Sequence, residues 1–300
     1  MPEPASQPSE APPRSGPVAF VTYAALPQLA RDDQLIIPHL AARGLDAEPV
    51  AWDAPAAWDS YRAVVLRSCW DYHLRPAEFA AWVDRLAQLG VPLWNPPAIV
   101  RWNIEKGYLR DLAARGVAVP PTAWLDRGAT PDLAALLRER GWSRAVVKPT
   151  ISATAHNTWL TSPATAAADQ PRLAAQLAGS AAMVQEFVAE VVEQGEWSLM
   201  FFGGRFSHAV LKQARPGDFR VQDDFGGTAV LAQPAPALIA QAQQLLGCVE
   251  APLLYARVDA VERGGRLLLI ELELIEPSLF LAEAPEAPAR LAQAIAEYLG

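Results

Sequence analysis

The sequence of 300 residues has little cysteine, no long apolar run and no excess of basic charge. The two cysteines, Cys69 and Cys248, are too few and too far apart for a disulfide framework, so we expect reduced thiols and a cytoplasmic protein. No apolar run approaches the roughly 18 residues that span a bilayer, and the start lacks a charged segment followed by an apolar core. We therefore expect neither a membrane partner nor an export signal. The net charge of −8 argues against nucleic acid as a partner, because phosphate binding needs clustered Lys and Arg.

What is present indicates a folded protein of more than one lobe. Hydrophobic residues make up 51% of the chain and charged residues 19%, which is typical of a globular protein. A chain of this length can form two or three packed lobes. Residues 1–16 are rich in Pro, Ser and Glu, and we interpret them as a disordered leader.

Residues 17–97 have the pattern of a small open α/β lobe. Val18–Tyr23 and the uniformly apolar Tyr61–Leu66 predict buried strands, with further strands at residues 47–51 and 91–95. A helix capped by Asp32 and Asp33 is expected to end at Gly44, and a second helix covers residues 78–89. This order predicts a mostly parallel sheet.

The remaining chain alternates between helices and strands. We predict helices at residues 103–115 (with Lys106 in the first turns), 132–140, 161–178, 235–246 and 288–299. We predict strands at residues 145–149 and 182–188 and hairpins at residues 196–212 and 257–275. Residues 212–228 are irregular, basic and glycine-containing, which in a compact domain usually indicates function.

Three carboxylates in the last hairpin predict a metal site. Apolar and acidic residues alternate in Ile270–Ile275, so Glu271 and Glu273 project from one sheet face that Asp259 can reach. Carboxylates brought together in this way repel one another unless cations lie between them. Oxygen-only ligation suits Mg²⁺ or Mn²⁺. The alternative is the solvated face of an edge hairpin.

A phosphate site is predicted where the strand 145–149 ends. Lys148 emerges from an apolar strand, where its ammonium needs an anion. The small and hydroxyl residues of the following loop, 150–158, can close over phosphates with backbone amides, although a Ser/Thr-rich connector explains the same composition.

The loop after the third strand, 67–73, predicts substrate contacts. Ligands of open α/β sheets bind beyond the carboxyl ends of the strands. Arg67 could hold a carboxylate, and Ser68, Asp71 and Tyr72 could supply hydrogen bonds. The alternative is a packed Trp-Tyr corner. Little near Cys69 would lower the pKa of its thiol, which argues against a cysteine nucleophile.

In this order, the features resemble the ATP-grasp superfamily of carboxylate–amine ligases, in its glutathione-synthetase-like branch. The lysines, the Gln-Glu-Phe-Val connector at 185–188, the basic loop and the acidic hairpin carry the resemblance. The runs 65–72 and 271–278 are also similar to the D-cycloserine-forming (O-ureido-serine) cyclo-ligases and their uncharacterised relatives. The resemblance implies an α/β (α+β) fold whose pre-domain precedes two sub-domains, 98–187 and 188–300, that clasp ATP.

The resemblance also implies roles for individual residues. ATP would be held by Lys106 and Lys148 at the phosphates, Ser152 in the covering loop, Gln185, Glu186, Phe187 and Val188 at the adenine, and Glu196 at the ribose. Asp259, Glu271 and Glu273 would hold two Mg²⁺ (or Mn²⁺) ions, while Arg257, with Lys212 or Arg220, would stabilise the transferring phosphoryl group.

The expected activity is ATP-dependent, ADP-forming ligation or ring closure of a small amino-acid-like carboxylate through an acyl phosphate. Two departures matter: the superfamily often has Asn where Glu273 stands, and the loop 151–158 contains no glycine. The second departure favours an alternative, a nucleotide-binding regulatory module without ligation. The lack of a histidine-rich metal site argues against a metal-dependent hydrolase. Relatives with short pre-domains are often dimers, so the resemblance also suggests a homodimer.

Overall fold

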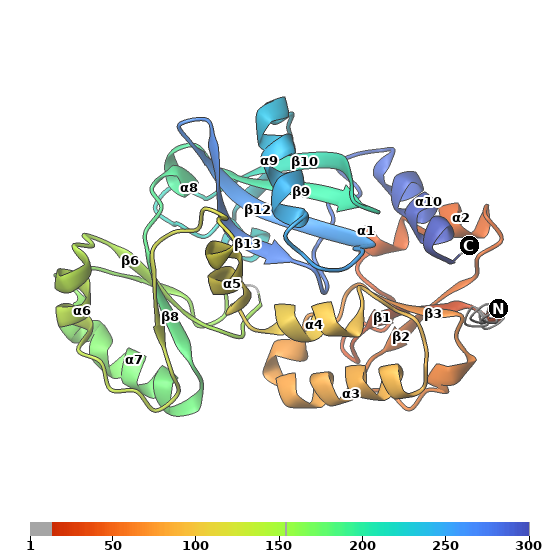
Figure 1. The fold of residues 1–300 in the computed structure, drawn as a ribbon, viewed down its shortest axis with the longest axis horizontal. Helices are drawn as coiled ribbons and strands as arrows, with labels where there is room; N and C mark the ends of the chain where they lie inside the picture. Colours follow the sequence, from red (N-terminus) through yellow and green to blue (C-terminus); the bar gives the residue numbers. More distant parts are fainter. Residues whose placement is uncertain (1–13, 154, 300) are drawn as a thin grey trace, which may run out of the picture.

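The structure is a computed structural model that describes residues 14–153 and 155–299, apart from the side chain of Asp223. Three sheets, each with its own helices, form three lobes (Figure 1). The predicted leader lies outside the described residues except for residues 14–16. Arg14 donates to the carbonyl oxygens of Asp59 (2.8 Å) and Gly90 (2.9 Å), so this end of the leader is tied to the first lobe.

The first lobe contains a four-stranded parallel sheet in the order β2-β1-β3-β4. Its strands are β1 Val18–Thr22, β2 Ala47–Ala51, β3 Ala63–Leu66 and β4 Leu93–Trp94. Its helices are α1 Arg31–Gln34, α2 Ile37–Ala41 and α3 Pro76–Gln88, with 3₁₀ turns η1 Trp58–Ser60 and η2 Tyr72–Leu74. The parallel sheet confirms the prediction for this lobe.

The single helix predicted to begin at Asp32 is wrong, because the chain forms two short helices there. Pro38 lies in the first turn of α2, where its missing N–H and fixed φ favour a new helix start. Asp32 is not the cap of α1. Its carboxylate instead accepts the backbone N–H groups of Leu281 (3.0 Å) and Ala282 (2.8 Å), which ties the first lobe to the C-terminal lobe.

The helix predicted over residues 103–115 is also wrong. The chain forms α4 Pro97–Ile104 and α5 Tyr108–Ala114, and Glu105 between them is extended. The backbone N–H of Lys106 donates to the carbonyl of Thr150 (2.8 Å) rather than along a helix. Lys106 is therefore fixed at a break between two helices, beside the start of the loop 150–158.

The central lobe is an antiparallel sheet in the order β5-β8-β6-β7, with α6 and α7 packed on it. Its elements are β5 Thr122–Leu125, α6 Leu133–Arg140, β6 Ala145–Pro149, β7 Trp159–Thr161, α7 Ala166–Gly179 and β8 Ala182–Glu186. The Asp132 side chain caps α6 by accepting the N–H of Ala135 (2.8 Å), and Gly141 ends it in a left-handed conformation. The helix start predicted at Thr161 is wrong because Trp159–Thr161 pairs with β6 as a short strand.

The C-terminal lobe is an antiparallel sheet in the order β11-β10-β9-β12-β13. Its elements are α8 Glu190–Glu193, β9 Glu196–Phe202, β10 Arg205–Gln213, η3 Asp223–Phe225, β11 Thr228–Leu231, α9 Pro236–Leu246, β12 Tyr255–Arg263, β13 Arg266–Glu273 and α10 Ala287–Leu299. Gly264 and Gly265, both at positive φ, form the predicted two-residue turn between β12 and β13. The edge strand β11, which begins at the last residue of the segment predicted to be irregular, was missed.

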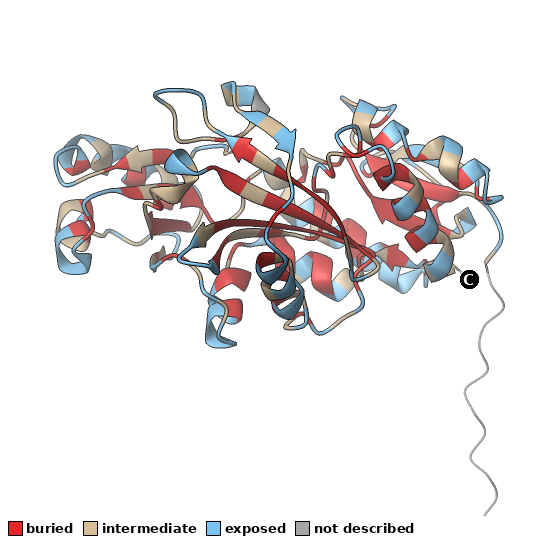
Figure 2. Ribbon diagram, turned by 90° about the horizontal axis from the view of Figure 1, so that it is seen from above, coloured by how far each residue is buried: buried red, intermediate tan, exposed pale blue. Residues whose placement is uncertain are grey.

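The buried residues do not separate the lobes cleanly. One hydrophobic cluster contains residues of β1 and β3, of β9 and β10, and of α10, so the first and C-terminal lobes share a core. In a second cluster α5 packs against the C-terminal sheet, with Leu109 and Leu112 beside Val258 and Leu272. Figure 2 shows these buried strands inside and the exposed surfaces of the helices outside. The predicted domain ranges remain a prediction.

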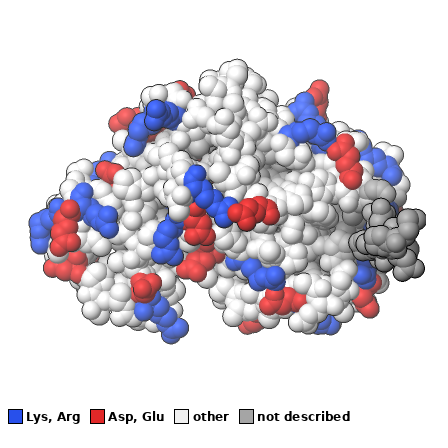
Figure 3. Space-filling model, viewed as in Figure 1, with Lys and Arg blue, Asp and Glu red and all other residues white. Residues whose placement is uncertain are grey.

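The outer surface carries both signs of charge. Among the described residues on the face in Figure 3, basic and acidic side chains are interspersed, without a continuous basic patch. No helix in the described part of the chain is both long and apolar enough to cross a membrane.

Candidate active site

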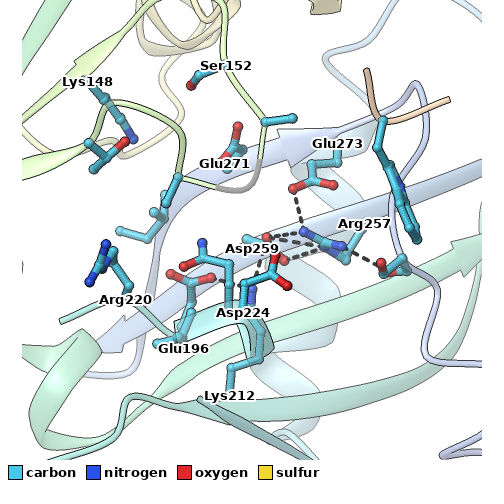
Figure 4. Close-up of a pocket in the computed structure, with 18 of the residues that line it drawn as sticks. Lys148, Ser152, Glu196, Lys212, Arg220, Asp224, Arg257, Asp259, Glu271 and Glu273 are labelled. Atoms are coloured by element: carbon cyan, nitrogen blue, oxygen red, sulfur yellow. Dashed lines mark hydrogen bonds and ion pairs between the residues drawn. The ribbon is translucent and has the colours of Figure 1, made fainter. Parts of the chain in front are cut away.

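A cavity of about 910 Å³ lies between the three lobes. Its walls come from the ends of β6 and β8, from the face of β9, β10, β12 and β13, and from the loop that follows β3. Charged side chains from these elements converge on it (Figure 4). The cavity therefore collects groups that are far apart in the sequence.

All three lysines of the chain line this cavity. Lys106, Lys148 and Lys212 are the only lysines among the 300 residues, and each is buried, with at most 9% of its surface exposed. Buried ammonium groups are costly unless they meet an anion. Their concentration here indicates that the cavity is built for a negatively charged ligand.

Lys212 is held between two carboxylates. Its Nζ lies 2.6 Å from Glu196 Oε1 and 3.2 Å from Asp259 Oδ2. Burial opposes the charge on Lys212, yet Asp259 and Glu196 outweigh it and raise the pKa of the ammonium. Burial also raises the pKa of Glu196, against the pull of Lys212. We expect the charged state of Lys212 to persist at neutral pH.

Arg257 forms the centre of a second charged group. It donates to Asp259 (2.9 Å from Nη2 to Oδ2), to Glu273, and to the carbonyl of Ser278 (3.0 Å), as Figure 4 shows. Ser198 Oγ adds a hydrogen bond to Asp259 Oδ1 (2.5 Å). Burial opposes ionisation of Asp259, but Arg257 and Lys212 hold its pKa at about 2. Burial raises the pKa of Glu273 to about 7 despite its contact with Arg257.

Lys106 and Lys148 lie nearer the central lobe and differ in their partners. Lys106 Nζ lies 2.8 Å from Glu271 Oε1 and donates to the carbonyl of Ser152 (2.9 Å). Lys148, on the opposite side of Figure 4 from Arg257, has no carboxylate within 4 Å among the described residues. Burial lowers the pKa of Lys148, and Glu271 offsets this in part. Lys148 is therefore the cation most in need of an external anion.

The three predicted metal ligands lie on one sheet face, as their spacing required. Asp259 pairs with Glu271 in the β-ladder and Arg257 pairs with Glu273, so all four side chains share a face. Among the described residues, no three Asp, Glu, His or Cys side chains converge as a ready metal site. Each carboxylate is instead neutralised by a protein cation. The oxygen donors suit Mg²⁺, with phosphate oxygens needed to complete its coordination.

The predicted adenine segment lies at the other end of the cavity. Gln185, Glu186, Phe187 and Val188 all line it, together with apolar side chains such as Ile270. The backbone N–H groups of Glu186 and Phe187 already donate within the protein, to Pro121 (2.9 Å) and Arg144 (3.1 Å). In the described part of the chain, the Val188 N–H has no backbone acceptor, so it is the donor that remains for a ligand.

The predicted phosphoryl-transfer residue Arg220 lines the cavity but is engaged. Its guanidinium donates to Asp218 (2.8 Å from Nη2 to Oδ2) and lies 3.6 Å from the centre of the Phe225 ring. The hydrogen bonds from Arg220 hold the pKa of Asp218 below its ordinary value. Arg257 and Lys212 thus contact the carboxylate cluster directly, whereas Arg220 contacts Asp218 instead.

Two residues of the loop 150–158 take a backbone conformation that glycine usually adopts. Ala155 and Asn157 take positive φ values of 51° and 52°, a conformation usually left to glycine. Ser152, Ala153 and Ala155 line the cavity. These residues therefore reach left-handed conformations without glycine, and described residues of the loop contribute to the cavity wall.

The predicted substrate residues are only partly in the cavity. Asp71 lines it, whereas Arg67, Ser68 and Tyr72 are buried in the first lobe and do not. Arg67 donates to Asp33 (2.9 Å) and to the carbonyl of Pro277 (2.7 Å), and Ser68 donates to Asp33 (2.6 Å). The assignment of Arg67 as a carboxylate receptor needs correction, because its guanidinium is fully occupied inside the protein.

The remaining residues of that loop fit the packed-corner interpretation in part. Tyr72 stacks on Phe79 with ring centres 5.0 Å apart, and Cys69 is fully buried, which raises the pKa of its thiol. Asp71 accepts hydrogen bonds from Trp52 Nε1 (2.8 Å) and Arg75 (2.8 Å). The loop therefore contributes few free polar groups to the site.

Several cavity residues were missed from the sequence. They include Tyr23, Asp32, Trp70, His73, Glu276 and Ser278. Glu276 belongs to the acidic run after β13, but it lies past the end of the strand, so alternation could not assign it a face. Its position after Leu274-Ile275, where the alternation stops, was the only available signal.

Comparisons with known proteins agree with this geometry. A family model for the N-terminal domain of D-cycloserine synthetase DcsG matches residues 18–95. The chain is 34% identical to the cycloserine biosynthesis protein DcsG of Streptomyces lavendulae over 302 aligned residues, covering 95% of this chain and 99% of that protein. The crystal structure of D-cycloserine synthetase DcsG matches with a TM-score of 0.86 and 32% identity, covering 95% of this chain and 100% of that one.

More distant structures share the fold. The D-alanine–D-alanine ligase of Bacillus anthracis complexed with ATP matches with a TM-score of 0.63 and 12% identity, over 95% of this chain and 97% of that one. The ATP-grasp ligase PsnB, complexed with a precursor, Mg and ADP, matches with a TM-score of 0.64 and 15% identity, over 94% and 98% of the two chains. The fold is thus the predicted ATP-grasp fold, and the chain belongs to the DcsG-like family of ATP-grasp proteins.

Proposed function

We propose that this protein is an ATP-dependent, ADP-forming ligase that closes a ring in, or joins an amine to, a small amino-acid-like carboxylate. ATP would supply the phosphoryl group that activates the substrate carboxylate. An amine nitrogen then attacks the carbonyl carbon of the acyl phosphate, loses a proton, and phosphate leaves. Ring closure to a cycloserine-like product is the first candidate, because DcsG is described as a D-cycloserine synthetase and is 34% identical over nearly the whole chain.

The observation that carries the proposal is the placement of all three lysines and Arg257 around one cavity. Phosphoryl transfer to a carboxylate depends on positioned cations more than on a protein nucleophile. Lys106 and Lys148 would bind the α- and β-phosphates, and Arg257 and Lys212 would face the transferring group. The buried walls and the loop 150–158 would exclude water from the acyl phosphate.

Metal binding would require the lysines and arginine of the site to exchange their carboxylate partners for phosphate. The negative phosphates would draw the cations away from Glu271, Glu273 and Asp259, which frees these carboxylates for two Mg²⁺ ions. The ATP complex and the Mg and ADP complex of the two distant ATP-grasp ligases support this ligand set. Adenine would bind beside Val188, and the ribose hydroxyls near Glu196.

The test is MgATP consumption with a panel of D- and L-amino acids and their ureido and aminooxy derivatives, reading ADP, phosphate and the product mass. The proposal expects ADP only with particular amino-acid-like carboxylates, and a product mass consistent with ring closure or joining. A rise in melting temperature with MgATP, but no ADP with any member, would favour the non-catalytic nucleotide-binding module. If ATP neither bound nor turned over, the proposed function would be wrong.

A further inference from the structure

The segment that follows β13 is held in place by an unbroken series of side-chain contacts. Each carbonyl oxygen from Leu274 to Leu279 faces a nitrogen or hydroxyl of another side chain. The partners, in order, are Asn95 (2.7 Å), Tyr255 (2.8 Å), Trp70 (3.1 Å), Arg67 (2.7 Å), Arg257 (3.0 Å) and His208 (2.9 Å).

These contacts fix the segment from two sides. Asn95, Trp70 and Arg67 come from the first lobe, while Tyr255, Arg257 and His208 come from the C-terminal sheet. Six consecutive carbonyls that each face a side-chain nitrogen or hydroxyl leave the backbone little freedom, although the single proton of the Tyr255 hydroxyl is shared with the carbonyls of Leu66 and Trp94. The buried Arg67 thus serves the site indirectly, through the carbonyl of Pro277.

Two residues of this fixed segment line the cavity, Ser278 and Glu276, and Glu276 is the charged one. It lines the cavity, and among the described residues it has neither an ion-pair partner nor a side-chain hydrogen bond. This sets it apart from Glu196, Asp259, Glu271 and Glu273, each of which contacts a lysine or arginine. Glu276 is only half-buried, and a carboxylate that is partly removed from water without a partner is favourably paired with a cation from outside.

Three of the four buried cations that line the cavity already contact other carboxylates. Lys106 contacts Glu271, Lys212 lies between Glu196 and Asp259, and Arg257 contacts Asp259 and Glu273. Asp71, which the sequence suggested as a hydrogen-bonding group for the substrate, already contacts Trp52 and Arg75. The aromatic side chains of Tyr23, Trp70 and Phe280 line the same cavity and favour a small organic cation over a free metal ion.

We infer that Glu276 binds the non-reacting α-ammonium group of the substrate, while Arg257 faces the carboxylate that becomes phosphorylated. The inference rests on the proposed function and assigns the residue that recognises the ammonium group of its amino-acid-like substrate. Arg257 also donates to the carbonyl of Ser278, so the group that faces the carboxylate and the group that binds the ammonium are anchored to one segment.

The inference is tested by matched pairs of ligands that differ only in the ammonium group. The pairs are O-ureidoserine (both enantiomers) with 3-(ureidooxy)propanoate, and serine (both enantiomers) with 3-hydroxypropanoate. Binding is measured by calorimetry to the full-length protein saturated with a non-hydrolysable ATP analogue and Mg²⁺, and ADP formation is measured in parallel with ATP. Loss of one charge-assisted hydrogen bond weakens binding by about 30- to 100-fold.

We expect the wild-type protein to prefer the ammonium-bearing member by about that factor, and Glu276→Gln to reduce the preference to within about threefold. Glu276→Asp should keep part of the preference, and the exposed control Glu250→Gln should keep all of it. Melting temperatures of the variants identify any failure to fold. A structural role alone would not change the ratio between paired ligands.

The outcomes separate the two proposals. An unchanged preference in Glu276→Gln, or no binding of any ammonium-bearing member to the wild-type protein, would overturn the role of Glu276. Ammonium-selective binding that depends on Glu276 but is never followed by ADP would support the inference and contradict the ligase. ADP formation without any preference for the ammonium-bearing ligands would support the ligase and contradict the role of Glu276.

Discussion

Lys106 Nζ lies 2.8 Å from Glu271 Oε1, so the lysine that we propose binds phosphate is neutralised by the carboxylate that we propose binds metal. Although burial opposes ionisation of Glu271, Lys106 and Lys148 hold the pKa of its carboxyl below the ordinary value. Lys212 and Asp259 form the same kind of pair on the other side of the site. Both groups of each pair can stay charged in the nucleotide-free protein, ready to exchange partners when phosphate and metal enter together.

This relationship predicts that Glu271→Gln decouples ATP binding from Mg²⁺. The amide cannot replace a carboxylate on the metal, so ADP formation should fall by about 100-fold or more, and half-maximal activity should need more Mg²⁺. The measurement is a Mg²⁺ titration of ADP release, and the exposed Glu250→Gln is the control. An unchanged Mg²⁺ requirement in Glu271→Gln would show that this carboxylate does not bind the metal.

We expect replacement of Lys148 to stabilise the nucleotide-free protein and to weaken MgATP binding. Its ammonium is buried without a carboxylate within 4 Å in the described structure, and burial lowers its pKa. Lys148→Met removes this desolvated charge, so without nucleotide we expect the free energy of unfolding to rise by about 1 kcal/mol. With MgATP, the ligand-induced rise in melting temperature should disappear. Thermal unfolding with and without MgATP measures both effects.

The control for this change is Arg138→Met, which removes a charge at an exposed position of α6. It should leave the MgATP shift unchanged. A Lys148→Met protein that is less stable without nucleotide and still responds fully to MgATP would contradict the phosphate-binding role.

Local patterns predicted those elements whose signals lie within a few residues. The alternation in Ile270–Ile275 and the glycine turn at 264–265 gave the register that sets Asp259 opposite Glu271. Strands β7 and β11 span three and four residues and exist because a neighbouring strand pairs with them, so no local pattern marks them. The break at Lys106 depends in the same way on the carbonyl of Thr150, 44 positions later in the chain.

The site was predicted best where family motifs name a residue and worst where distant contacts decide. The loop after β3 does reach the cavity, as the sheet-edge rule required, but only through Trp70, Asp71, His73 and Leu74. Whether Arg67 points into the cavity depends on Asp33, which is 34 positions away in the sequence and forms its buried partner. That ion pair forms only when the lobe is packed, so neither the residues around Arg67 nor those around Asp33 predict it.

Two interpretations of Arg67, a buried partner of Asp33 and a receptor for the substrate carboxylate, can be distinguished by experiment. Breaking a buried ion pair from one side leaves a charge without a partner, so Arg67→Met should lower the free energy of unfolding by about 3–5 kcal/mol. The residual ATP affinity of the folded fraction should be normal. Chemical denaturation and MgATP binding measure the two quantities, with Asp33→Asn as a second break of the same pair. A stable Arg67→Met protein with a raised substrate KM would restore the carboxylate-receptor assignment.

The unpaired Glu276 predicts a pH dependence with a definite sign. Burial, and then the charge of Glu273, raise the pKa of Glu276 to about 8, with Lys106 and Arg257 acting in the opposite direction. The carboxylate that binds an ammonium is therefore scarce at pH 6.5 and predominates above pH 8. Below this pKa, kcat/KM for an ammonium-bearing substrate should rise by up to about tenfold per pH unit, because the ionised fraction rises by that factor.

The same group links stability to pH in the other direction. The folded protein holds this proton more tightly than the unfolded chain, whose carboxyl has an ordinary pKa near 4.5, so the contribution to stability falls as the pH rises from about 4.5 towards 8. Glu276→Gln, which cannot titrate, should reduce the slope of both profiles, with the titration of Glu273 remaining, whereas the profile for KM of ATP should not change. Initial rates from pH 6 to 9 and melting temperatures from pH 5 to 8 give the comparison. Parallel profiles for wild type and Glu276→Gln would exclude Glu276 as the titrating group, and with it the account of how the substrate ammonium is bound.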